Sequence, residues 1–128
     1  KQLTTYTLHL IQKNEALKEL RAKIYKSMRI SDKATYNKLK GFLEVIDYNF
    51  RNDKEWEKFQ LYFEEVHAGF FEKLMSENPN ITPQDLRHCA LIKLNLSIQE
   101  VATVMGISGE SVKTSRFRLR KKMEIIVK

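Results

Sequence analysis

The residues most suited to chemistry lie near the C-terminal end of the chain and are cationic, hydroxyl-bearing or aromatic. They are Ser111, Lys113, Thr114, Arg116, Phe117, Arg118, Arg120, Lys121 and Lys122. Such side chains bind phosphate oxygens and the edges of bases. Between Gly109 and Lys122 the only acid is Glu110. A merely solvated helix face is the alternative, but it usually carries interspersed acids. This bias predicts contact with nucleic acid.

The spacing of these residues predicts a helix with two different sides. At about 100° per residue, Val112, Leu119 and Met123 fall on one side, with the stem of Arg116 beside them, and would anchor the helix. The opposite side would carry Lys113, Thr114, Phe117, Arg120 and Lys121, with Arg118 on a flank. We expect the second side to face a DNA groove.

Position along this helix predicts different roles. Lys113 and Thr114 lie on its first turns, which enter the major groove in helix-turn-helix proteins, so we expect them to read bases. Phosphate contacts are expected from Arg118, Arg120, Lys121 and Lys122. Phe117 has two possible roles: apolar contact with a thymine methyl group or a deoxyribose, or packing against a helix of this domain or of a dimer partner.

The residues just before this helix predict a tight turn and a short companion helix. Ser97 and Glu100 have capping-box spacing, and Ser108 can cap the second helix, which would begin near Gly109. Gly106 suits the left-handed residue that ends the first helix, and Ile107 would fill the corner. A helix-turn-helix is therefore predicted.

The same segment resembles the C-terminal DNA-binding domain of LuxR/FixJ-type transcription regulators. The likeness is carried by Ile81 to Leu86, Leu96 to Ala102, Met105 to Ser108 and Ser111 to Thr114. It implies a scaffold helix at about 83–95, the two helices of the motif, a fourth helix that often dimerises, and base contacts from Lys113 and Thr114. The chain departs from the family pattern at Ser111 (usually Thr), Ser115 (usually His) and Asn95 (usually Gly). Asn also tolerates the left-handed conformation.

Few residues follow the motif, so a dimer surface is expected elsewhere. Leu3, Leu10, Leu17 and Ile24 recur every seven residues, which is typical of a helix that pairs along a seam. We expect a dimer through this row. The alternative is a single amphipathic helix packed on its own domain, because Lys13 and Ser27 interrupt the second heptad position.

The middle of the chain predicts a helical connector with an aromatic core. Ser31 can cap a helix that reaches Phe50, and Asn52 or Asp53 can cap a longer helix that ends at Asn78-Pro79. Apolar residues on the longer helix share a stripe: Trp56, Phe59, Phe63, Val66, Phe70 and Leu74. Some Bacteroidetes-type regulators, in which a long helix and a Trp-x-x-Phe-rich helix precede a LuxR-like domain, resemble the whole chain.

Composition agrees with an all-α protein. We expect a helical arm at 1–30, a connector at 31–80 and the DNA-binding domain at 81–128. The net charge is +7. Cys89 is the only cysteine, so an intrachain disulfide is excluded and a reducing compartment is expected. The three histidines lack metal-ligand spacing. We expect no cofactor, metal, catalytic group or membrane contact in a bacterial, cytoplasmic protein. Because the first residue is Lys1, we expect a longer protein that holds a sensor.

Together these features predict a sequence-specific transcription regulator that binds double-stranded DNA as a homodimer, with RNA polymerase as a further candidate partner. Two alternatives stay open. One is a promoter-recognition module like that of a sigma factor, which would need polymerase-binding regions that the chain does not display. The other is a helical protein-interaction adaptor that uses the aromatic helix and the heptad row.

Overall fold

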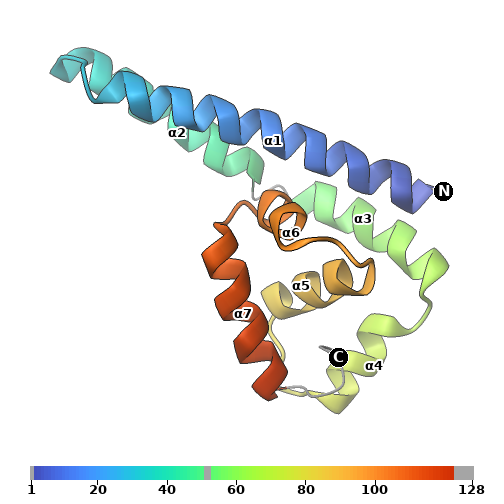
Figure 1. Ribbon diagram of the computed structural model, residues 1–128. Helices are drawn as coiled ribbons and strands as arrows, with labels where there is room; N and C mark the ends of the chain where they lie inside the picture. The colour runs from blue at the N-terminus through green and yellow to red at the C-terminus, as the bar shows by residue number, and fades with distance from the viewer. Residues whose placement is uncertain (1, 51–52, 123–128) are drawn as a thin grey trace.

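The computed structural model describes residues 2–50 and 53–122, and within these ranges the fold is all-α, as predicted, with no strand. The helices in chain order are α1 (Gln2–Met28), α2 (Lys33–Phe50), α3 (Asp53–Val66), α4 (Phe70–Glu77), α5 (Pro83–Lys93), α6 (Ile98–Met105) and α7 (Gly109–Lys122). Figure 1 shows α1 and α2 as a long hairpin, with α3 continuing below α1 and the remaining helices clustered on one side.

The hairpin turns at residues 29–32, and a side-chain cap begins its second helix, α2. The carboxylate of Asp32 accepts a hydrogen bond from the Thr35 backbone N–H at 2.8 Å. The hydroxyl of Ser31 instead donates to the Met28 carbonyl at 3.0 Å. The predicted Ser31 cap is therefore wrong by one residue, because the Ser31 hydroxyl is engaged at the end of α1 and Asp32 accepts from the first turn of α2. Apolar side chains between the two helices form a small core: Leu17, Ile24, Met28, Leu39, Leu43, Ile46 and Phe50.

The long aromatic helix expected after residue 53 is broken into α3 and α4. Gly69 has a φ of 80°, a left-handed value that ends a regular helix and that glycine adopts without steric cost. The break lets the aromatic stripe fold back on itself, since the ring of Phe63 lies 5.1 Å from the rings of both Phe70 and Phe71. The two short helices thereby wrap around one core, which a straight helix could not do.

The heptad row of α1 packs against other helices of the same chain. Leu3 and Leu10 are buried in one core with Phe59, Val101 and other residues of α3 to α7. Ile24 is buried and Leu17 partly buried in the core of the hairpin. This corrects the expected dimer seam at Leu3, Leu10, Leu17 and Ile24, because side chains covered by helices of their own chain cannot line a second interface. The arrangement is the single packed amphipathic helix of the alternative.

Candidate nucleic-acid interface

Local hydrogen bonds fix the helix-turn-helix, as the sequence predicts. The Ser97 hydroxyl accepts from the Glu100 N–H at 3.1 Å, and the Glu100 carboxylate accepts from the Ser97 N–H at 2.8 Å. Gly106 ends α6 with a φ of 69°, and the Ser108 hydroxyl accepts from the Ser111 N–H at 3.1 Å to cap α7. Asn95, with a φ of 61°, ends the α5 region in the left-handed conformation expected of it.

A second capping box, which sequence reasoning missed, starts the scaffold helix α5. Thr82 and Asp85 cap each other's backbone N–H groups, and Pro83 occupies the first helical position. The pattern Thr-x-x-Asp before an apolar run is the signal that would have found it. Asp85 is 2% exposed and its carboxylate also lies 3.5 Å from the Arg118 guanidinium, which ties α5 to α7.

The anchoring side of α7 is the one that was predicted. Val112 and Leu119 are fully buried. Arg116 lies on the same side and is partly buried, and its guanidinium donates to the Leu96 carbonyl at 3.5 Å. Arg116, expected as a DNA ligand, thus points toward the α5–α6 loop and not toward the exposed face. Met123 lies outside the described residues.

The opposite side of α7 presents an exposed basic face, which we call the α7 face. It comprises Lys113, Thr114, Phe117, Arg120 and Lys121, all exposed as the spacing predicted. The Lys113 ammonium lies 3.7 Å from Glu110 in an exposed i,i+3 pair, which is worth little. Ser111 is exposed at the start of the helix. Of the remaining predicted cations, Arg118 is exposed beside Asp85, and the side chain of Lys122 lies outside the described part of the chain.

Phe117 is the unusual member of the α7 face, because its side chain is 60% exposed. Packing against another helix of this chain, one of its two expected roles, does not account for that exposure. The Lys121 ammonium lies 4.9 Å from the ring centroid, within range of a cation–π contact. The ring is therefore available for apolar contact with a partner.

Two titratable groups lie behind α7 and support it. His88 is 1% exposed, and burial, reinforced by the Arg116 guanidinium, lowers its pKa to about 4. Burial likewise raises the pKa of the neighbouring Cys89 thiol to about 12. Both groups are therefore uncharged at neutral pH, as a core requires. Among the described residues no group of three or more His, Cys, Asp or Glu side chains lies close enough to hold a metal ion.

The hairpin is joined to the helix-turn-helix at a polar junction that the sequence did not reveal. Asn14 of α1 is 3% exposed, and its side-chain amide donates to the carbonyls of Thr103 and Val104, each at 2.9 Å. These carbonyls belong to the last turn of α6, where carbonyls lack the regular i+4 helical donor, and that of Thr103 also accepts from the Gly106 N–H at 3.3 Å. The Lys13 ammonium donates to the Asn49 carbonyl at 3.1 Å. Lys13, which interrupts the heptad, thus attaches α1 to the end of α2.

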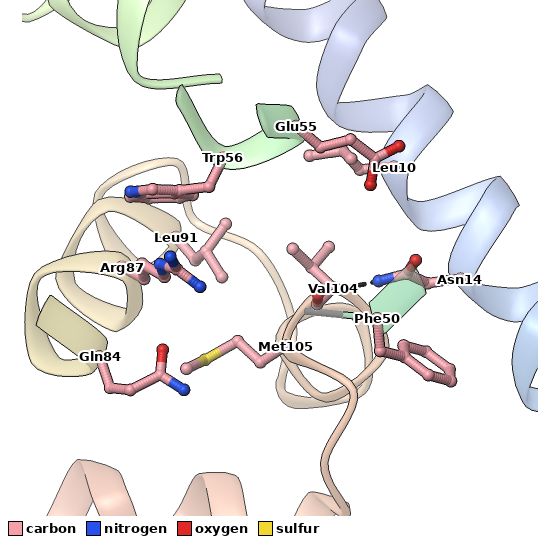
Figure 2. A pocket seen from close by; sticks show the side chains of 10 residues that line it. All are labelled: Leu10, Asn14, Phe50, Glu55, Trp56, Gln84, Arg87, Leu91, Val104 and Met105. Atoms are coloured by element: carbon pink, nitrogen blue, oxygen red, sulfur yellow. Dashed lines mark hydrogen bonds between the residues drawn. The ribbon is translucent and has the colours of Figure 1, made fainter. Parts of the chain in front are cut away.

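A cavity of about 70 Å³ lies beside this junction. Figure 2 shows its lining, with Asn14 reaching Val104 on one side and Arg87 and Trp56 on the other. The Arg87 guanidinium carbon lies 5.1 Å from the Trp56 ring centroid. A space of this size accommodates a few water molecules. Its walls come from α1, α2, α3, α5 and α6, so the cavity marks where the hairpin meets the other helices.

Comparison with known proteins adds no relative: no family model, curated protein or solved structure matches the chain. None of the described helices combines the length and the apolar character needed to cross a membrane.

Proposed function

We propose that this chain is a sequence-specific DNA-binding module of a transcription regulator, with α7 inserted into the major groove. The observation that carries the proposal is the exposed α7 face, which combines three cations, a hydroxyl and an aromatic ring. It follows a tight turn after α6, and its other side is fixed by Val112 and Leu119. Cations with hydroxyl groups on the first turns of such a helix suit both phosphates and base edges.

Selection from a pool of random duplexes tests the proposal directly. We expect the chain to enrich one short site, and Lys113→Ala to lose about 1–3 kcal/mol on that site while relaxing the preference at one or two positions. Arg120→Gln should instead weaken binding to every sequence alike and reduce the salt slope by about one unit. Lys93→Ala, at the end of α5 and exposed, is the matched control.

The outcomes separate this proposal from its alternatives. If Lys113→Ala keeps the site preference of the parent chain, the bases are read by Thr114 or Phe117 instead. Absence of salt-dependent DNA binding would favour a protein-interaction adaptor. DNA binding that requires added RNA polymerase would favour a promoter-recognition module like that of a sigma factor.

We further propose that two copies act together on DNA. A single recognition helix covers too few base pairs for strong discrimination, so related motifs read paired half-sites about 34–36 Å apart or at multiples of that distance.

A further inference from the structure

The α1–α2 hairpin carries an excess of positive charge. Residues 16–40 hold eight Lys and Arg against two acids. Along α1, Asn14, Lys18, Arg21 and Tyr25 are separated by four, three and four residues. Residues at this spacing lie on the same side of a helix. A single stripe therefore runs from Asn14 to Tyr25, and Arg29 follows it in the turn after α1.

This stripe lies on the side of α1 that meets α6. Asn14, its first member, donates to the Thr103 and Val104 carbonyls of α6. Lys18, its second member, lines a shallow groove together with Glu15 and Glu19 of α1 and Gln99 and Thr103 of α6. At 1.5 Å per residue, the stripe extends for about 16 Å from Asn14 to Tyr25.

Helix α2 continues the same surface. Lys33, Tyr36, Lys40, Glu44 and Asp47 are separated by three, four, four and three residues and so share one side of α2. A carboxylate oxygen of Asp47 lies 3.7 Å from the guanidinium of Arg21, which places that side of α2 beside the stripe of α1.

The excess of positive charge is concentrated toward the tip of the hairpin, where residues 21–43 hold seven Lys and Arg and one acid. Acids lie beside the other cations of this surface, since Glu15 and Glu19 line the groove with Lys18 and Glu44 shares the side of α2 that carries Lys40. Asp47 pairs with Arg21, and the carboxylate of Asp32 is engaged as the cap of α2. The remaining cations and two tyrosines are exposed, and we call them the hairpin face: Lys18, Tyr25, Arg29, Lys33, Tyr36 and Lys40. Tyrosine adds an apolar ring and a hydroxyl donor, both suited to a sugar-phosphate backbone.

The α1–α2 hairpin and α7 flank a corner of the molecule. Figure 1 shows the hairpin projecting past the end of α7 that adjoins α6, while α7 runs away from the hairpin. The angle between them is fixed because α1 packs directly on α6 through Leu10 and Asn14. A duplex carries one phosphate charge per about 1.7 Å of its axis, counted over both strands, and the phosphates on its near side lie within reach of such a surface. A second copy of this hairpin would bring like charges together instead.

We infer that the hairpin face is a second DNA-binding surface, which holds the phosphate backbone beside the base pairs read by α7. The inference rests on the proposed function and deepens it. It assigns sequence-independent affinity to the hairpin and base reading to α7. The footprint on DNA is then longer than α7 alone can produce, and it extends on the side of the site where the hairpin lies.

A charge-matched pair of triple variants tests the inference. The first, Arg29→Gln with Lys33→Gln and Lys40→Gln, removes three cations from the hairpin face. The second, Lys23→Gln with Lys26→Gln and Lys38→Gln, removes three exposed cations from other sides of the same helices. Circular dichroism establishes that both triple variants fold. Fluorescence anisotropy then measures their Kd on two duplexes: a long one centred on the selected site, and a short one that ends at the bases read by α7.

On the long duplex we expect the first variant to bind about tenfold or more weakly and to lose about three units of salt slope, whereas the second changes much less. On the short duplex the first variant and the parent chain should bind equally. Equal losses for both triple variants on the long duplex would overturn the inference. So would a loss confined to phosphatidylserine vesicles, which would identify a lipid surface as the partner. A parent chain that selects no DNA site would instead contradict the proposed function itself.

Discussion

At the scale of single residues, His88 makes the stability of the folded chain depend on pH. Its pKa in the folded chain is about 4, against an ordinary value of 6.5, because it is buried near the guanidinium groups of Arg116 and Arg118, with the Asp85 carboxylate opposing them. Between these two values the unfolded chain takes up a proton that the folded chain does not. Stability is therefore unaffected by His88 above pH 6.5, falls as the pH drops toward 4, and levels off below that.

The expected outcome is a loss of unfolding free energy between pH 7 and pH 4.5 that His88→Gln reduces. Urea denaturation at the two pH values measures it. Arg118→Gln serves as a second variant, because Arg118 is one of the cations that oppose protonation of His88. An identical pH dependence for the parent and His88→Gln would contradict the assignment.

Residue-scale prediction from the sequence succeeds where local geometry decides and fails where two distant elements meet. The exposed set Lys113, Thr114 and Phe117 follows from helical periodicity alone. The inward direction of Arg116 does not, because it depends on the Leu96 carbonyl of the preceding loop. Asn14 is the same case: its partners lie about 90 positions away in sequence, and an isolated Asn in an amphipathic helix gives no sign of them.

At the scale of elements, two predictions were wrong for the same physical reason: the dimer seam on α1 and the single long aromatic helix after residue 53. A heptad row and an aromatic stripe each show that a helix buries one side, but they do not show what covers it. In α1 the cover comes from α2, α3 and α6, so the row that resembles a dimer seam is an internal one. In the aromatic segment Gly69 was visible in the sequence, but only the left-handed backbone there shows that it divides α3 from α4.

The internal position of the row leads to a prediction about Leu10. Leu10→Ala should destabilise the chain by about 2–5 kcal/mol, because it leaves a cavity in a core shared by several helices. Leu8→Ala, in the same helix but 51% exposed, should change stability by about 0.5 kcal/mol or less. Urea denaturation measures both. A loss of stability for Leu10→Ala no larger than that for Leu8→Ala would contradict the internal position of the row.

At the scale of the whole molecule, the buried core does not follow the three segments expected from the sequence. One cluster contains Leu3 and Leu10 of α1, Phe59 of α3, Leu91 of α5 and Val112 of α7. The hairpin is therefore attached to α3, α5, α6 and α7 by core packing. Such an attachment favours the proposed binding of DNA by the hairpin face and the α7 face together, since a flexible arm would lose conformational entropy on binding.

The state of assembly follows from the same core. With the α1 row covered and a net charge of +7, two free chains repel each other and lack the predicted seam, so we expect a monomer in sedimentation velocity at tens of micromolar. On duplexes with two half-sites we expect two copies, with cooperative binding when the half-site centres are one helical turn apart and none at one and a half turns. A dimer without DNA would contradict this. Phe42→Lys would then test the exposed apolar side of α2, where Phe42 and Val45 are 56% and 60% exposed, as the surface that forms it.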